Sequence, residues 1–409
     1  MRARAAVLSA VLAALSATAQ AMPYIPPPQP VYEAPIDRAL ANVNAMDGVE
    51  AAQRERLLGR LNLLAYARND AAFAYLREND ALNEGGSVPC SEAPHMIPPD
   101  QPQPKFEPGE RCARWTFDLR PQLELPANPP PANMSAGARA RLEAARDHYR
   151  RALQLDGANL RARLGYAYVL DRLSDVRGAR NELRTILRQG LPRLAGEHSE
   201  WEDHAVLTEA AAHLAHLASS ARDRSKLRQL RDRLQASQPM IFVTPIVVPF
   251  TDAPFTRLVD DGAPVAFDFA GTGDTRARGW LNDNAAWLVW DPDWRGAVRS
   301  GFDMIGQRTW AVFWNDGFEA LRALDDNRDG ELTGAELGGL SLWRDENGNG
   351  VSEPGEVIPV NVHGIEALSV RGEATRPGLI TAPNGVRFDD GSTRPLYDWT
   401  PGLAPAPVA

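Results

Sequence analysis

The chain has 409 residues, 44% of them hydrophobic, which is enough for roughly two or three domains with apolar cores. Its formal net charge is −9 and unevenly spread: from Met240 onward there are 25 acidic and 13 basic residues, a net charge of −12, whereas the preceding part sums to +3. An acidic C-terminal part argues against nucleic acid as a partner, because its recognition needs a basic surface.

The first 21 residues have the features of a secretory signal peptide. Arg2 and Arg4 form a basic start, residues 5–17 are apolar, and the Ala-Gln-Ala at 19–21 is a small-x-small cleavage site. We therefore predict cleavage after Ala21 and a periplasmic or secreted protein. The alternative is an uncleaved anchor, but the apolar run is short for a bilayer core of about 30 Å. No membrane span is expected after cleavage.

The next two segments are expected to act as connections and to contain no catalytic site. Residues 22–35 are rich in proline and predict an extended linker. Segment 36–134 begins with the apolar spacing of one or two amphipathic helices and then becomes rich in proline and turns. It contains the only two cysteines, Cys90 and Cys112. Their even count in an exported chain predicts one disulfide, with two free thiols as the alternative.

Residues 135–238 are expected to be helical and contain an internal repeat. Small and apolar residues recur with a period of 34: Ala145, Tyr149, Ala152 and Gly157 correspond to Ala179, Leu183, Ile186 and Leu191. The pattern resembles the tetratricopeptide repeat, in which small residues let the two helices of a hairpin pack closely. The resemblance implies a concave face that binds a protein or peptide partner. A helical bundle with an accidental period is the alternative.

Four histidines fall in this helical segment: His198, His204, His213 and His216. His213 and His216 are three residues apart and could share a helix face near Glu209. The sequence contains no H-E-x-x-H motif and no supporting acid–histidine pattern, so we predict surface histidines rather than a metal site.

From residue 239 the apolar pattern changes to that of strands, and residues 239–400 predict a β-rich domain. Prolines in the run 240–250 predict an edge strand or a crossover connection there. Eight of the ten tryptophans lie between 280 and 399, which predicts an aromatic core. Turns are expected at Asn384-Gly385 and Asp390-Gly391, and residues 401–409 are predicted to be a disordered tail.

Two runs of the same form begin twenty residues apart in this domain, at Asp325 and Asp345. Both match D-x-[DN]-x-[DN]-G-x5-E, the twelve-residue loop that wraps a calcium ion in an EF-hand. Calcium takes six to eight oxygen ligands at about 2.3–2.6 Å, which explains the alternating short polar residues, the glycine at position 6 and the closing glutamate at position 12. The predicted calcium ligands are Asp325, Asn327, Asp329, the carbonyl of Glu331, Thr333 and Glu336 in the first loop, and Asp345, Asn347, Asn349, the carbonyl of Val351, Glu353 and Glu356 in the second.

The spacing of the loops argues against a sensor-type pair. Only residues 337–344 connect them, which predicts one short helix leaving the first loop and entering the second. Pro354 and Gly355 predict that the helix after the second loop is short or absent. Position 8, where paired EF-hands form a two-stranded bridge, is held by Leu332 in one loop and Ser352 in the other. A calmodulin-like opening motion is therefore not expected.

The residues flanking the loops extend the pattern. Phe267-Asp268-Phe269-Ala270-Gly271-Thr272-Gly273, Asp291-Pro292-Asp293-Trp294-Arg295-Gly296 and Gly364-Ile365-Glu366-Ala367-Leu368 surround them in that order. This order resembles a bacterial secreted domain found alongside hemolysin-type repeat proteins, and the whole chain resembles secreted proteins that join tetratricopeptide-like helices to such an EF-hand domain. In that pattern the stretches at 268 and 291 would also be calcium loops, but ligand positions are lost, as at Phe302, so no metal is predicted there.

Together these observations predict an α+β fold: an N-terminal all-α helical-hairpin region followed by a β-containing domain with two tandem EF-hand-type loops. The sequence contains no G-x-S-x-G, P-loop, H-E-x-x-H or C-x-x-C motif, so no enzyme is predicted. The leading hypothesis is an exported calcium-binding protein in which Ca²⁺ is structural. The alternatives are an interaction scaffold of the cell envelope and a calcium-stabilised hydrolase.

Overall fold

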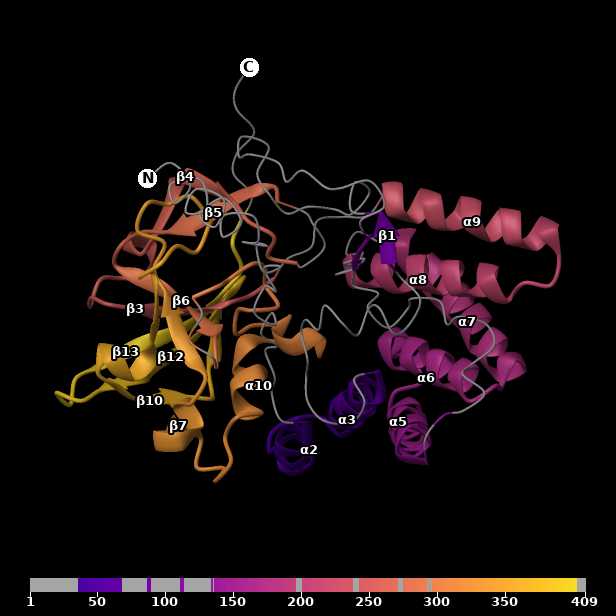
Figure 1. The fold of residues 1–409 in the computed structure, drawn as a ribbon, viewed down its shortest axis with the longest axis horizontal. Coiled ribbons are helices and arrows are strands. Elements are labelled where there is room, and N and C mark those ends of the chain that lie inside the picture. Colours follow the sequence, from indigo (N-terminus) through magenta and orange to yellow (C-terminus); the bar gives the residue numbers. More distant parts are fainter. Residues whose placement is uncertain are drawn as a thin grey trace, which may run out of the picture.

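A computed structural model of the chain describes residues 36–67, 87–89, 111–113, 134, 136–195, 201–237, 243–270, 275–292, 294 and 296–402. The N-terminal half is helical and the C-terminal part is a curled antiparallel sheet, which confirms the mixed helix-and-sheet class (Figure 1). The predicted signal peptide, the linker, Cys90 and residues 403–409 of the tail lie outside the described residues. The predicted disulfide is therefore untested, although Cys112 lies on β2 (Arg111–Ala113), which pairs with β1 (Ser87–Pro89).

The helices described in the N-terminal half are α2 (Ile36–Ala45), α3 (Ala51–Ala67), α5 (Ala136–Leu155), α6 (Leu160–Arg172), α7 (Val176–Gly190), α8 (Trp201–Leu217) and α9 (Ala221–Ala236). From α5 to α9 each helix packs on the next. Most residues of the 34-residue period are core positions: Ala145, Tyr149, Ala152, Ala179, Leu183 and Ile186 are buried. A Cβ at Gly165 would lie 2.3 Å from the Tyr149 ring, so glycine is needed where α6 crosses it.

The α2–α3 pair lies between the sheet and the other helices (Figure 1). Its buried residues Ala39, Val43, Leu57 and Leu61 belong to the same apolar core as the sheet. Leu63, on another face of α3, belongs to the core of the later helices. The pair therefore joins the two halves of the chain. None of the helices that the structure describes combines the length and hydropathy needed to span a membrane.

The sheet is antiparallel throughout. Its nine strands are β3 (Ile246–Pro249), β6 (Ala285–Trp290), β7 (Glu331–Thr333), β8 (Leu340–Trp343), β9 (Val357–Pro359), β10 (Ile365–Ser369), β11 (Glu373–Arg376), β12 (Leu379–Phe388) and β13 (Thr393–Trp399). The order is β7-β10-β12-β13-β3-β6-β8-β9, and β11 pairs with β12. A separate hairpin is formed by β4 (Val259–Ala266) and β5 (Ala277–Leu281). The two three-residue strands β7 and β9 end the strand order.

Two strand predictions are wrong for local reasons. The segment predicted to be an edge or crossover contains β3, a fully buried strand between β13 and β6. Its proline, Pro249, is the last residue of the strand, where a missing N–H interrupts the ladder least. Asn384-Gly385 is not a turn but part of β12, at a register shift between Ala382 and Val386. The predicted turn at Asp390-Gly391 is confirmed and joins β12 to β13.

Tryptophan side chains fill the domain interior as predicted. Among the eight between 280 and 399, all but Trp294 are buried. The rings of Trp280 and Trp343 meet edge to face at 5.5 Å, and Trp287 stacks on Trp399 at 5.7 Å. Offset and edge-to-face contacts of this kind are the preferred aromatic geometries.

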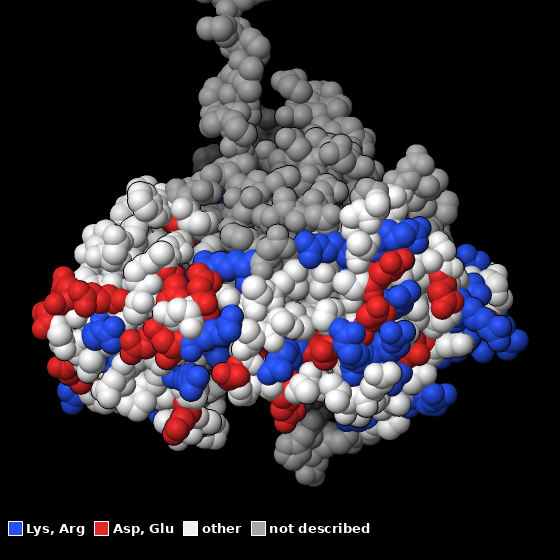
Figure 2. Space-filling view, turned by 90° about the horizontal axis from the view of Figure 1, so that it is seen from below, with Lys and Arg blue, Asp and Glu red and all other residues white. Residues whose placement is uncertain are grey.

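Charge divides along the same boundary as the secondary structure. Acidic side chains gather over the sheet domain, and basic ones are more frequent over the helices (Figure 2). The division agrees with the net charge of −12 from Met240 onward and +3 before it.

Candidate functional site

The first loop, Asp325–Glu336, connects a short helix to the edge of the sheet. Helix α10 (Gly317–Arg322) precedes it, N-capped by the Asp316 carboxylate, which accepts from the Glu319 N–H at 2.7 Å. Strand β7 lies inside the loop, and a 3-10 turn, η5 (Gly334–Leu337), closes it. A short helix therefore leads directly into the first loop.

The second loop, Asp345–Glu356, connects β8 to β9. The prediction that a helix enters this loop is wrong: only the η5 turn follows the first loop, and strand β8 enters the second. Buried Leu342 and Trp343 place this connection in the sheet, where the strand pairs with β6. The prediction that no long helix leaves the second loop is confirmed, since β9 begins directly after Glu356.

The position-1 carboxylates are held by backbone donors in both loops. Asp325 accepts from the N–H of Arg328 (2.7 Å) and of Gly330 (3.1 Å). Asp345 accepts from the N–H of Asn349 (3.1 Å) and, at 2.8 Å, from the glycine at position 6 of its own loop. That glycine has φ of +73° in the second loop and +95° in the first. A left-handed backbone at position 6 explains why both loops carry glycine there.

The position-12 glutamates fold back in the same way. Glu336 Oε1 accepts from the N–H of Asp326 at 2.8 Å, and its Oε2 accepts from the N–H of Thr333 at 3.0 Å. Glu356 accepts from the equivalent positions 2 and 9 of its loop, at 3.1 and 2.9 Å. Thr333 and Glu336 also form a capping box at the start of η5.

The middle positions repeat the pattern a third time. Asn327 Oδ1 accepts from the N–H of Asp329 at 2.8 Å, and Asp329 Oδ1 accepts from the N–H of Glu331 at 2.9 Å. In the second loop the corresponding distances, to Asn347 and Asn349, are 3.1 and 2.7 Å. The side chains at positions 1, 3, 5 and 12 therefore each accept at least one backbone N–H from the same loop position in both loops.

The chemistry of the donor set suits a hard cation. Each carboxylate oxygen has more than one lone pair, so an oxygen that accepts one N–H keeps further acceptor capacity. Across the described part of the chain, however, no group of three or more His, Cys, Asp or Glu side chains is arranged to hold a metal. Calcium loops also use amide and carbonyl oxygens. Each loop has an asparagine at position 3 and a backbone carbonyl at position 7, and the second loop has another asparagine at position 5.

Like charges face each other inside each loop. Burial raises the pKa of the Asp325 carboxyl, backbone donors oppose that increase, and the Glu336 carboxylate adds to it. Burial likewise raises the pKa of Asp345, with the same addition from Glu356. A bound cation would relieve this repulsion.

The loops are not paired with each other at position 8. Leu332 lies opposite Leu368 in the β7–β10 ladder. Ser352 Oγ instead accepts from the N–H of Val298, at 2.8 Å. The two loops are thus built into different parts of the domain, and the two-stranded bridge of paired EF-hands is replaced by these contacts.

The segment that begins at Asp291 keeps part of the loop geometry. Asp291 Oδ2 accepts from the N–H of Gly296 at 2.9 Å, and both Trp294 and Gly296 have positive φ. Asp303 Oδ2 accepts from the N–H of Arg299 at 2.8 Å. Asp303 stands one residue beyond position 12, where the motif has its closing glutamate. A search for glutamate at position 12 misses this aspartate. Residues 293 and 295 lie outside the described residues, and no metal is assigned here.

The prediction of surface histidines is wrong for His204, which is buried, and for His213. Its side chain is fully buried, and Nε2 lies 2.9 Å from Asp171 Oδ2 on the neighbouring helix α6. Its ring also meets the edge of Tyr168. The pair packs α8 against α6, which is a structural role.

A groove of about 540 Å³, not anticipated from the sequence, borders the first loop. Its lining includes Thr333, Leu337, Asn361, Arg387 and Trp294. Trp294 is 73% exposed, and Arg387 forms an ion pair with Glu331 at 2.8 Å. The groove offers one aromatic face and one arginine beside the loop.

Comparison with known protein families finds a match within the sheet domain. The SPM domain family matches residues 255–399, a range that includes both loops. The iron-regulated protein FrpA of Neisseria meningitidis serogroup C is 29% identical over 113 residues, which is 26% of this chain and 10% of that protein. The chain thus spans about a tenth of the length of this curated relative. Part of the chain, from Phe255 to Trp399, is therefore similar to an SPM domain.

Proposed function

We propose that the chain is an exported calcium-binding protein in which the ion stabilises the sheet domain and takes part in no catalysis. The observation that supports this best is the repeated hydrogen-bond pattern of the two loops. Two twelve-residue stretches that differ at most non-ligand positions hold their oxygen-bearing side chains in the same way. The proposal includes the EF-hand-type identity of both loops and the periplasmic or secreted location.

The positions of the loops suggest what the ion does. The first loop contains β7 and the second leads into β9, and these three-residue strands end the order of the sheet. Strands this short add little stability by themselves. A cation that cross-links each loop would fix both ends of the sheet.

A second candidate function is a scaffold for a protein or peptide partner. The burial of the repeated residues on α5 and α7 supports a tetratricopeptide-like arrangement for residues 135–238. Capture of a defined envelope protein by the full chain, lost when surface residues of α5–α7 are exchanged, would support it. Equal capture by the wild type and by the variant with exchanged surface residues would count against it.

The calcium proposal is tested by calorimetry and thermal unfolding of the full chain, in calcium and in chelator. Extracellular calcium modules bind at about 10⁻⁴–10⁻³ M, and an ion at about 100 times its Kd stabilises by about 2.7 kcal/mol. For a domain of this size, that raises the Tm by about 5–10 °C per site. We expect Glu336→Gln and Glu356→Gln each to remove one binding event.

Glu373→Gln is the matched control, because Glu373 is exposed on β11 and outside both loops. It should bind calcium like the wild type. Equal Tm values in calcium and in chelator, with no heat of binding, would show that the proposed function is wrong.

A further inference from the structure

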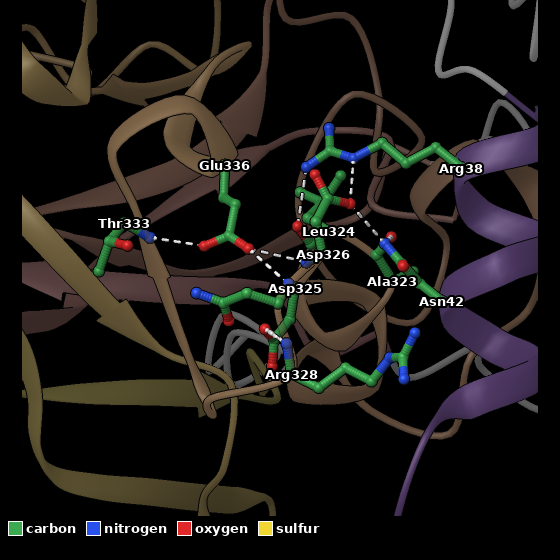
Figure 3. A network of polar contacts seen from close by, with 10 residues as sticks. Arg38, Asn42, Ala323, Leu324, Asp325, Asp326, Arg328, Thr333 and Glu336 are labelled. Carbon is green, nitrogen blue, oxygen red and sulfur yellow. Dashed lines mark hydrogen bonds and ion pairs between the residues drawn. The ribbon is translucent and has the colours of Figure 1, made fainter.

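Two side chains of helix α2 donate hydrogen bonds to the residues at the start of the first loop. Arg38 Nε and Asn42 Nδ2 both donate to Asp326 Oδ1, each at 2.8 Å. Arg38 Nη2 also donates to the carbonyl of Leu324 (2.7 Å), and Asn42 Nδ2 to that of Ala323 (2.9 Å). Figure 3 shows both side chains reaching from the helix to this turn. Four hydrogen bonds thus fix residues 323–326, where α10 ends and the loop begins.

The side chain and the backbone N–H of Asp326 have different partners: the side chain contacts helix α2, and the N–H faces the interior of the loop. Asp326 occupies position 2, which supplies no side-chain ligand in a calcium loop, so its carboxylate is available to α2. Its backbone N–H donates inward to Glu336, the closing residue of the loop (Figure 3). The residue held by the helix is therefore also one of the backbone donors that orient the closing carboxylate.

Within the described part of the chain, the second loop has no such contact with a helix and serves as an internal comparison. Its position-2 residue, Glu346, is 65% exposed, and its ion pair with Arg344 is long, at 3.8 Å. Arg344 immediately precedes that loop and belongs to no separate element. Among the contacts of the described residues, the first loop alone is tied to a helix almost 300 residues away in the sequence.

The α2–α3 pair is anchored independently of the loop. Val43 is fully buried in the core that contains Leu321 and Leu324. On α3, Arg56 Nη2 donates to the carbonyl of Phe313 at 2.6 Å, and Arg60 donates through two nitrogens to that of Ala311. The pair therefore contacts the chain at points from 311 to 326, a stretch that includes the first ligand position, Asp325.

We infer that calcium binding at the first loop is coupled to the docking of α2, with Arg38 and Asn42 as positioning residues. The inference rests on the proposed calcium function. With α2 docked, the loop entrance is ordered before the ion arrives; without it, the ion must order the entrance itself, and the apparent affinity falls. Linkage is reciprocal, so calcium in the first loop must also stabilise the docked helix.

Calorimetry of the full chain with CaCl₂ tests whether the docking of α2 raises the calcium affinity of the first loop. Asn42→Ala removes two hydrogen bonds without changing any charge, so attraction between the loop and the ion is unaltered. We expect the affinity of one site to fall about fivefold or more, while the other site stays as in the wild type. Asn44→Ala, an exposed position on the same helix, is the matched control and should leave both sites unchanged.

Hydrogen exchange of the α2 amides tests the reciprocal half in the unmutated helix. Calcium should slow exchange in the wild type and in Glu356→Gln, but not in Glu336→Gln. If calcium binds yet Asn42→Ala has wild-type affinity, or α2 exchange does not respond to the ion, the coupling is refuted while the calcium function stands. If wild-type calorimetry shows no binding, both are refuted.

Discussion

Two glycines in the second loop provide a sharp test of how this loop is seated. Gly348 and Gly350 both have a left-handed backbone, with φ of +66° and +73°. A Cβ added at Gly348 would meet nothing within 4 Å, whereas one at Gly350 would lie 2.6 Å from Val265 Cγ1 and 2.9 Å from the carbonyl oxygen of Ala266. The two positions share a backbone cost and differ in steric overlap with β4.

The magnitudes follow from these two terms. Alanine in a left-handed conformation costs about 1–2 kcal/mol, so Gly348→Ala should reduce the free energy of unfolding by about that amount. Gly350→Ala adds an overlap that must be relieved by moving backbone, which costs about 1–3 kcal/mol more. The total for Gly350→Ala is about 2–5 kcal/mol.

The assay is urea unfolding followed by tryptophan fluorescence, in chelator so that the ion contributes nothing. Comparison is direct if both variants keep the wild-type m value. Equal midpoints for Gly348→Ala and Gly350→Ala would refute the packing of the second loop on β4. A larger effect at Gly348 would refute it as well.

Three further predictions concern the core, a buried acid and the contact between α3 and the sheet domain. Leu332→Ala, at a fully buried position of β7, should lower the free energy of unfolding by about 2–5 kcal/mol, against less than about 0.5 kcal/mol for the exposed Leu155→Ala. Burial raises the pKa of Asp303 to about 6, so the wild type loses stability as the pH rises from about 4 to 6. Asp303→Asn should therefore be about 3 kcal/mol more stable relative to wild type at pH 7 than at pH 4 in denaturation experiments; a pH-independent difference would contradict this. Arg60→Met leaves the Ala311 carbonyl without its two donors and should cost about 1–3 kcal/mol in the same assay, with an unchanged midpoint as the contrary result.

The features that could be predicted from the sequence were those that depend on residues close to one another in the chain. Apolar spacing gave the helices, and the repeated Ala145 and Ala179 mark core positions. Features that depend on distant partners were not accessible. The buried partner of His213 is Asp171, which lies 42 residues earlier in the chain. Strand β3 is central because it pairs with β13 and β6, which are distant from it in the sequence.

The loops show the same division. Their ligand spacing defined them, but nothing in positions 325–336 indicates that Asp326 is held by Arg38. The loops' separate surroundings were also hidden, since Leu332 meets Leu368 and Ser352 meets Val298 only in the folded chain. Asp303 was missed because it stands one residue outside the motif.

The central place of β3 has a consequence for how this domain relates to its relatives. The range similar to an SPM domain begins at residue 255, after β3 has ended at Pro249. A fragment cut at that boundary would lose the strand that joins β13 to β6, and the sheet would divide into two smaller ones, each with a new unpaired edge. The range of sequence similarity is therefore shorter than the sheet to which it belongs, and we expect a stable fragment of this domain to include β3.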